Sequence, residues 1–348
     1  MASVNWKKVG ALIFTFFLSC VWTTFVLLRT LWDIFRNGYD SYTFTKKRAE
    51  PPAVLVDGWN HATVKLSKVA LHYVYGGARD KPLMLFLHGF PEFWYSWRHQ
   101  IREFESDHRV VAVDMRGYGQ SDKPSGRFNY NIELLSQDVK ELVLALGYNS
   151  CVLVAHDWGG AVAWNTALMY PEIVDKLVVM NCPHSLAFAK HLAKNYTQLL
   201  KSWYMFFFQC PFLPECTMRS HDYQFFEQVF RGKEAGCTNA DALSDQDMEA
   251  WKYTFSRAGA LTPPINYYRA AFTRLSKPPT PKSFVVSAPT LIVWGTNDVA
   301  LETPMAELSA QYCRQVTVKY IEGASHWVQQ DQPQLCNMAI RSFLNQTA

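Results

Sequence analysis

The sequence predicts an α/β fold with a mostly parallel sheet, an inserted helical region and an apolar N-terminal helix. Three patterns in its 348 residues carry this prediction. Short apolar runs alternate with segments of helical periodicity, the alternation stops between about residues 184 and 284, and residues 9–28 form an uncharged apolar run. Alternating strands and helices are typical of a parallel sheet with helices on both faces.

The predicted strands are short, nearly continuous apolar runs, as expected for strands that are buried on both faces. They lie at residues 82–87, 109–113, 151–155, 176–180, 290–294 and 315–321. Helical periodicity falls at residues 132–146, 160–169 and 332–344. We therefore expect one α/β domain made of residues 68–183 and 285–348, interrupted by a helical domain at residues 184–284.

The uncharged run at residues 9–28 predicts a helix that crosses a membrane. A helix of this length spans about 30 Å, which is the thickness of the hydrocarbon core of a bilayer. A cleavable signal peptide usually has an apolar region of only about 7–15 residues that ends at a small-x-small site. This run is longer and ends in Val-Leu-Leu-Arg. We expect a retained single-pass anchor, followed by a juxtamembrane segment at residues 29–67.

Charge and composition exclude several classes of protein. Hydrophobic residues make up 49% and aromatic residues 15% of the chain, so it is not a disordered protein. Residues 1–48 hold seven Lys or Arg against two Asp, so the remainder carries a net charge of −1 within the total of +4. Such a body is not that of a nucleic-acid-binding protein. Basic residues flank the anchor on both sides, so their distribution does not decide on which side of the membrane the body lies. The glycosylation sequons at Asn195 and Asn345 do not decide it either.

The eight cysteines favour free thiols. Cys20 lies in the anchor, and the seven others form no CxxC pair, so we expect most of them to be core residues. Cys210, Cys216 and Cys237 are close in the sequence, so a disulfide between two of them is the alternative if the body lies in an oxidising compartment.

The motif His156-Asp157-Trp158-Gly159-Gly160 follows the predicted strand at 151–155 and precedes a predicted helix. This corner resembles the nucleophile elbow of α/β hydrolases, G-x-S-x-G, with Asp157 in place of the serine. The aspartate excludes a serine esterase or lipase acting through this corner. A carboxylate there can displace a leaving group at an sp³ carbon and form an ester that is then hydrolysed.

Hydrolysis of such an ester needs a base and an acid that orients the base. Asp298 follows the strand at 290–294, and His326 follows the strand at 315–321. The chain order of nucleophile, acid and base is that of the α/β hydrolases. We therefore predict that Asp157, Asp298 and His326 meet at the carboxyl edge of one sheet.

The tetrahedral intermediate of ester hydrolysis needs hydrogen-bond donors for its negative oxygen. The segment His88-Gly-Phe-Pro91 follows the predicted strand at 82–87. The backbone N–H groups of Phe90 and Trp158 are therefore the predicted donors of an oxyanion hole.

Five segments give the chain its resemblance to the epoxide hydrolases of the α/β-hydrolase fold. They are His88-Gly-Phe-Pro91, Arg116-Gly-Tyr-Gly-Gln-Ser-Asp122, His156-Asp-Trp-Gly-Gly160, Gly295-Thr-Asn-Asp298 and Ser325-His326-Trp327. The similarity extends from about residue 68 to the end. With its N-terminal anchor, the chain resembles the small membrane-anchored animal branch of the family, which implies the membrane of the endoplasmic reticulum.

In that family, two tyrosines of an inserted cap domain hydrogen-bond the epoxide oxygen. Asn266-Tyr267-Tyr268-Arg269 resembles the family's Asn-Trp-Tyr-Arg segment, which assigns Tyr268 and leaves Tyr267 as its aromatic neighbour. The pair Trp203-Tyr204 resembles the family's other tyrosine segment and assigns Tyr204.

The resemblance implies a two-step reaction that needs no metal and no organic cofactor. Asp157 attacks one epoxide carbon while Tyr204 and Tyr268 support the departing oxygen, and a hydroxyalkyl ester forms. His326, oriented by Asp298, then activates water, and a vicinal diol leaves. The implied partners are a lipophilic epoxide, chiefly a lipid or fatty-acid epoxide, water and the membrane. Chain length, regiochemistry, stereochemistry and oligomeric state stay open.

Two alternative functions use the same fold. Haloalkane dehalogenases share the aspartate elbow, but they usually carry Asn where Phe90 stands and lack the tyrosine pair. A non-catalytic, membrane-tethered binding module would be free to lose catalytic residues, and none is missing here. We interpret His88 and His156 as hydrogen-bonding scaffold residues, and Asp114 and Asp122 as residues that brace a loop.

Overall fold

The computed structural model describes residues 6–272 and 283–346. Its eight-stranded sheet has the order β1-β2-β4-β3-β5-β6-β7-β8. The strands are β1 (Asn60–Lys65), β2 (Ala70–Gly76), β3 (Leu83–Leu87), β4 (Arg109–Val113), β5 (Cys151–His156), β6 (Val174–Met180), β7 (Thr290–Gly295) and β8 (Val316–Ile321). β2 pairs antiparallel with both β1 and β4, and the other pairs are parallel. The predicted α/β class and all six predicted strands are confirmed.

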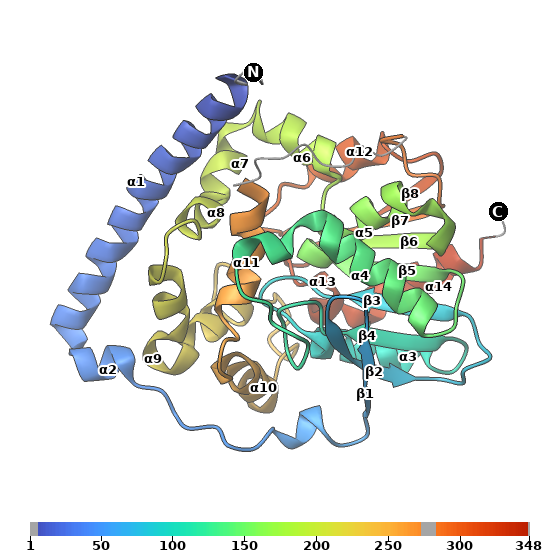
Figure 1. Cartoon of the computed structure of the whole chain (residues 1–348), viewed down its shortest axis with the longest axis horizontal. Coiled ribbons are helices and arrows are strands. Elements are labelled where there is room, and N and C mark those ends of the chain that lie inside the picture. Colours follow the sequence, from blue (N-terminus) through green and yellow to red (C-terminus); the bar gives the residue numbers. More distant parts are fainter. Residues whose placement is uncertain (1–5, 273–282, 347–348) are drawn as a thin grey trace.

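Helices cover both faces of the sheet (Figure 1). The helices of the described residues are α1 (Trp6–Asn37), α2 (Tyr39–Thr43), α3 (Arg98–Phe104), α4 (Ile132–Ala145), α5 (Asp157–Met169), α6 (Ser185–Leu192), α7 (Tyr196–Lys201), α8 (Trp203–Phe207), α9 (Leu213–Phe230), α10 (Asp245–Ser256), α11 (Thr262–Phe272), α12 (Pro304–Ala310), α13 (Val328–Asp331) and α14 (Pro333–Leu344). α4 packs against α5, and α3 packs against α14. Because the strand order reverses between β3 and β5, right-handed connections place α3 and α5 on opposite faces.

Every residue of β3, β4, β5 and β7 is buried. Full burial explains why their sequences are continuous apolar runs rather than alternating ones. The point where the order reverses, between β3 and β5, is where open α/β sheets bind ligands at the carboxyl ends of their strands. The segments after these two strands hold Phe90 and Asp157.

Two strands were not predicted, and two helices begin or end elsewhere than predicted. β1 lies within the predicted juxtamembrane segment and is a largely exposed edge strand without a continuous apolar run, and His72 interrupts the apolar run of β2. α5 begins at Asp157 rather than at residue 160, so the elbow aspartate is itself the first helical residue. α1 continues to Asn37, since Arg29 and Arg36 end the uncharged run but are good helix formers.

The segment between β6 and β7 contains the six helices α6 to α11 within the described residues. They form a layer between α1 and the carboxyl edge of the sheet (Figure 1). α9 is kinked at His221, Asp222 and Tyr223, which all have left-handed backbone angles. Residues 273–282 of the predicted inserted domain lie outside the described residues.

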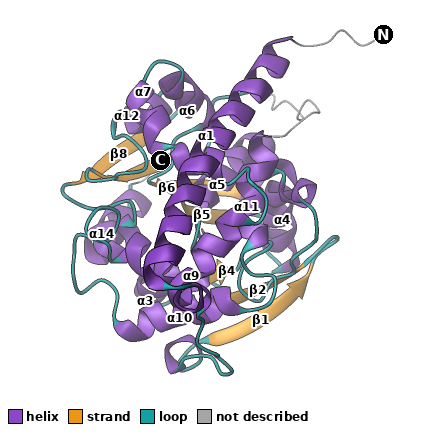
Figure 2. Cartoon of the chain, turned by 90° about the vertical axis from the view of Figure 1, so that its left-hand side faces the viewer, coloured by secondary structure: helices purple, strands orange, loops and turns teal. Residues whose placement is uncertain are grey.

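The N-terminal helix α1 is long and apolar enough over Gly10–Asn37 to cross a membrane. It does not stand apart from the body. When the left-hand side of Figure 1 faces the viewer, α1 runs across the front of the inserted helices (Figure 2).

Candidate active site

Asp157 lies at the corner between β5 and α5 with a left-handed backbone angle, φ +46°. Such a conformation costs a non-glycine residue about 1–3 kcal/mol and is typical of functional sites. Two glycines allow the crowded corner. A Cβ at Gly89 would lie 2.5 Å from the Asp157 Cβ, and one at Gly159 would lie 2.2 Å from the Leu87 carbonyl oxygen. The sharp turn thus presents the Asp157 carboxylate above the sheet.

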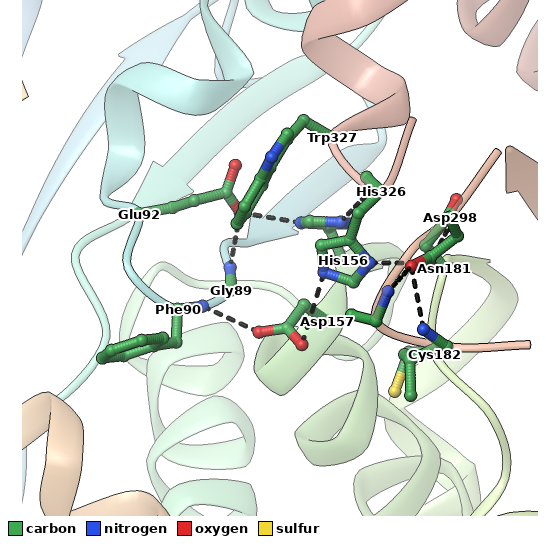
Figure 3. A network of polar contacts seen from close by, with 12 residues as sticks. Gly89, Phe90, Glu92, His156, Asp157, Asn181, Cys182, Asp298, His326 and Trp327 are labelled. Atoms are coloured by element: carbon green, nitrogen blue, oxygen red, sulfur yellow. Dashed lines mark hydrogen bonds and ion pairs between the residues drawn. The ribbon is translucent and has the colours of Figure 1, made fainter. Parts of the chain in front are cut away.

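The structure brings Asp157, Asp298 and His326 together, as the sequence predicts (Figure 3). His326 Nδ1 lies 2.7 Å from Asp298 Oδ2, and His326 Nε2 lies 3.7 Å from Asp157 Oδ2. The Asp157 side chain keeps 15% of its surface exposed, whereas that of Asp298 keeps none. One carboxylate therefore faces the substrate side and the other lies behind the imidazole.

Asp298 is held by a complete set of hydrogen bonds. Its Oδ1 accepts the backbone N–H groups of Ala300 and Leu301, at 2.8 and 2.9 Å. Its Oδ2 accepts Asn181 Nδ2 at 2.7 Å, and Asn181 is positioned in turn because its Oδ1 accepts the Gly295 N–H. These bonds fix the carboxylate that orients the His326 ring.

The two oxygens of Asp157 have different environments. Oδ1 accepts the backbone N–H of Phe90 at 2.8 Å, while Oδ2 faces His326. Trp158, the next residue, lies in the first turn of α5, where backbone N–H groups have no partner within the helix. The Phe90 N–H thus lies beside the carboxylate, and the Trp158 N–H stays the second predicted donor of an oxyanion hole.

Burial and neighbouring charges act on both titratable groups. Burial alone would raise the pKa of Asp157, but hydrogen bonding and charge from His326 lower it below its ordinary value. Burial alone would lower the pKa of His326, but Asp298 and Asp157 together raise it to about 10. At neutral pH the resting site therefore holds an imidazolium between two carboxylates.

A second polar network lies beneath the site and was not predicted. Its centre is Glu92, which is fully buried and whose Oε2 accepts the Gly89 N–H at 2.9 Å. His156 Nδ1 lies 2.7 Å from the same oxygen, and His156 Nε2 lies 2.9 Å from the His326 carbonyl oxygen. His156 therefore bridges the Glu92 carboxylate and the backbone of His326 (Figure 3).

This network joins three segments that carry the site. Glu92 Oε1 accepts the side-chain amides of Gln329 and Gln330, each at 2.8 Å. The loop after β3, the last residue of β5 and helix α13 are therefore bound to one carboxylate. Burial alone would raise the pKa of Glu92. His156 and the Gly89 N–H lower it by more, so the pKa lies below its ordinary value. The signal in the sequence is that Glu92 directly follows the His88-Gly-Phe-Pro91 segment.

Tyr204 and Tyr268 reach the site from α8 and α11. Their ring centroids lie 5.8 Å apart in an edge-to-face contact. The Tyr268 ring lies 5.2 Å from that of Phe90 and 5.0 Å from that of Trp158, so it lies over the two residues that flank Asp157. Burial, followed by the charge of Asp157, raises the pKa of both hydroxyls, which therefore stay protonated.

The predicted scaffold residues are hydrogen-bonded in the structure. His88 Nε2 accepts the Met115 N–H, and His88 Nδ1 contacts the Gly89 carbonyl oxygen. Asp114 accepts the Trp94 and Gln120 N–H groups, and Asp122 accepts the Ala70 N–H. The eight cysteines are free thiols. Within residues 6–272 and 283–346, no group of three or more His, Cys, Asp or Glu is placed to hold a metal ion.

The fold and this site define a class: hydrolases with a mostly parallel sheet and a carboxylate at the strand–helix elbow. The alpha/beta hydrolase fold family matches residues 82–333. The chain is 49% identical over 303 residues to epoxide hydrolase 1 of Caenorhabditis elegans, covering 87% of this chain and 74% of that protein. It is 44% identical over 327 residues to epoxide hydrolase 4 of Homo sapiens, covering 92% and 89%.

A solved structure gives the same result. The epoxide hydrolase of Bacillus megaterium in complex with an inhibitor has a TM-score of 0.74 and 34% identity, covering 82% of this chain and 100% of that chain. The chain belongs to the epoxide hydrolases of the alpha/beta hydrolase fold, and it is an enzyme of that class.

Proposed function

We propose that this enzyme converts lipid epoxides, such as fatty-acid epoxides, to vicinal diols through a covalent hydroxyalkyl ester on Asp157. The observation that carries the proposal is that the two carboxylate oxygens of Asp157 have different environments. Oδ1 is held by the Phe90 N–H, and Oδ2 faces the substrate side beside His326. A carboxylate in this arrangement has one oxygen free to attack and one in an oxyanion hole.

The first step opens the epoxide. Asp157 Oδ2 attacks one ring carbon, a new C–O bond forms, and the bond from that carbon to the epoxide oxygen breaks. The hydroxyls of Tyr204 and Tyr268 donate hydrogen bonds to the departing oxygen. One of them transfers its proton to that oxygen, which becomes a hydroxyl group, and a tyrosinate is left. Because their pKa is raised, both tyrosines enter this step as proton donors.

The second step hydrolyses the ester. Ester formation removes the negative charge of Asp157, so His326 loses one of the two carboxylates that raise its pKa. The imidazolium then gives up its proton more readily, and this proton returns to the tyrosinate that the first step leaves. The neutral imidazole takes a proton from the water molecule that attacks the Asp157 carbonyl carbon. The carbonyl oxygen is Oδ1, which the N–H groups of Phe90 and Trp158 stabilise as it becomes negative. Collapse of the intermediate breaks the bond from the carbonyl carbon to the diol oxygen, which takes the proton from His326 and leaves as the diol. The new carboxyl group gives its proton to His326, which regenerates the carboxylate and the imidazolium.

The remaining parts of the chain have matching proposed roles. Residues 184–284 would be the cap domain, which supplies the two tyrosines and an aromatic wall that includes Phe208. Helix α1 would hold the enzyme as a single-pass protein in the membrane of the endoplasmic reticulum, where lipophilic epoxides dissolve. The proposed roles use neither a metal nor an organic cofactor.

A diol assay tests the reaction. Detergent-solubilised enzyme is given fatty-acid epoxides and 1-haloalkanes, with Asp157→Ala as the blank and the exposed Asp175→Ala as the matched control. Diol from the wild type and from Asp175→Ala, but not from Asp157→Ala, is the expected result. Halide release without diol would instead support a dehalogenase. If a folded sample forms neither diol nor halide, the result would support a binding module.

Isotope labelling tests the covalent step. With enzyme in excess over epoxide, one turnover in H₂¹⁸O should place ¹⁶O from Asp157 in the diol and leave ¹⁸O in the protein. Direct attack of water on the epoxide would place ¹⁸O in the diol at once and would reject the ester.

A further inference from the structure

Helix α1 turns large apolar residues outward, unlike a helix on a water-soluble surface. The stripe that faces the body recurs at helical spacing and mixes small polar and apolar residues, namely Thr15, Leu18, Ser19, Trp22, Thr23, Val26, Thr30 and Ile34, together with Asp33. The outward side exposes large apolar residues, namely Phe14, Phe16, Phe17, Val21, Phe25 and Leu28. A helix that packs on a protein in water turns its apolar side inward. Small polar residues toward protein and large apolar ones outward are typical of helices in lipid.

Specific contacts hold α1 on the inserted helices. Trp22, in the middle of the apolar run, lies 5.5 Å from Trp203 of α8 between ring centroids. Further along, Asp33 Oδ2 lies 2.7 Å from His221 Nε2, at the kink of α9. Residues 22 and 33 are about three helical turns apart, so the helix lies along the inserted region rather than touching it at one point.

The chain that follows α1 is fastened to the same place. Arg48, whose side chain is 3% exposed, donates to both carboxylate oxygens of Asp222 at 2.6 and 2.7 Å and to Glu249 at 2.8 Å. The Lys46 N–H donates to Asp222, and the Asp222 N–H donates to the Phe44 carbonyl oxygen. Bidentate charged bonds of this kind are among the strongest in proteins. The segment after α1 is therefore bound to the inserted helices and is not a free tether.

Apolar exposure continues from α1 onto the elements beside it. Tyr196 and Leu200 of α7, Trp203 of α8, and Phe212 before α9 are exposed, and Phe212 keeps 80% of its surface accessible. At the C-terminal end of α1, exposed Trp32, Phe35 and Tyr39 accompany Arg29 and Arg36. Aromatic and basic residues together mark the edge of a bilayer.

We propose that α1 and the exposed apolar residues of α7 to α9 form one lipid-covered surface, which we call the membrane face. Bilayer lipid is the occupant that fits, because the outward side of α1 is apolar over its uncharged run and ends in an interfacial band. The proposal rests on the proposed function and extends it. Trp203 contacts α1 and directly precedes Tyr204, so the membrane face lies next to the reacting tyrosines and admits epoxides from the bilayer.

Photo-crosslinking of the full chain in phosphatidylcholine vesicles tests the surface itself. Benzoylphenylalanine is placed at Phe17, Leu200 or Phe212, and at the exposed controls Phe128 and Met338 on other parts of the body. Lipid adducts at the first three positions and none at the two controls are expected. Adducts at Phe17 alone would show that α1 enters lipid without the inserted helices, which overturns the proposal. This readout does not depend on turnover, so it stands even where the proposed reaction fails.

Kinetics tests the route of the substrate. Leu200→Asp and Phe212→Asp should slow hydrolysis of a long-chain epoxide dissolved in vesicles by about tenfold, because a charge is costly in lipid. Both variants should hydrolyse a short, water-soluble epoxide at the wild-type rate, and Met338→Asp should match the wild type on both substrates. Wild-type rates on the vesicle epoxide for Leu200→Asp and Phe212→Asp would overturn the route.

Discussion

The sheet edge and the inserted helices hold their parts of the candidate site in different ways. At the sheet edge, hydrogen bonds of 2.7 to 2.9 Å reach both oxygens of Asp298. In the inserted helices, edge-to-face ring contacts hold Tyr204 and Tyr268. Hydrogen bonds are directional, whereas ring contacts tolerate a range of distances and tilts. We infer that the edge fixes the reacting atoms, while the helices present an adaptable wall to the substrate.

The largest effect should come from the sheet edge. Asp157→Ala removes the nucleophile and should lower kcat by about 10⁴-fold or more, as losses of other covalent nucleophiles do. Diol formation measured by mass spectrometry checks this, with Asp175→Ala as the unaffected control. A residual rate near that of the wild type would show that the edge does not hold the nucleophile.

His326→Gln should separate the two steps at the same edge. Glutamine cannot take a proton from water, so the ester should persist and turnover should fall by about 10³-fold. Intact-protein mass spectrometry should show an increase by the mass of one epoxide. If a substrate that the wild type turns over leaves no adduct on this variant, then the base has been assigned wrongly.

Tyr268→Phe should show a graded effect, because Tyr204 remains to support the oxygen. Alkylation of Asp157 should slow by about 10²-fold, while ester hydrolysis keeps its rate. Pre-steady-state quenching resolves the two steps. The matched control is Tyr267→Phe, whose lost hydroxyl donates to the Arg116 carbonyl oxygen at 2.7 Å. That variant should lower Tm but leave alkylation unchanged. Equal alkylation rates in Tyr268→Phe and the wild type would assign the cap tyrosine to packing alone.

The smallest effect concerns stability. The pKa of His326 is raised to about 10 by Asp298 and Asp157, above its ordinary value of 6.5. The stabilisation is present in full below pH 6.5 and is lost as the pH rises towards 10. Tm should therefore fall between pH 7 and 9.5, by about 2–4 °C for each kcal/mol lost. His326→Gln should flatten this slope, and an equal slope in both proteins would contradict the imidazolium.

The sequence predicted the parts of the molecule that carry strong local patterns. The buried strands read as apolar runs, and the elbow, acid and base follow strands in a recognisable order, so their meeting at one edge was predictable. β1 was missed because a largely exposed edge strand has no apolar run, and β2 was missed because His72 interrupts its apolar run. The docking of α1 was also missed, since hydropathy describes how apolar a helix is and not which side turns toward the body.

The Glu92 network was beyond sequence reasoning for a different reason. Its members come from the loop after β3, the end of β5 and helix α13, and His156, Gln329 and Gln330 meet Glu92 only once the sheet has assembled. A buried carboxylate is favourable only with such partners, so neither its burial nor its role can be inferred from one position. The sequence shows only a glutamate in a loop, whereas the fold shows that its carboxylate binds His156, Gln329 and Gln330.

The adjacency of β6 and β7 has a consequence for how such a chain can change over generations. The two strands pair side by side although the inserted helices, more than one hundred residues, separate them in the sequence. The entropy of closing a loop grows only with the logarithm of its length, at about 0.6 kcal/mol for each doubling. Insertions, deletions and exchanges in that excursion therefore disturb the register of the sheet very little. The inserted helices, which face the substrate, can therefore change at one rate during evolution, and the sheet edge, which carries the reaction chemistry, can change at another.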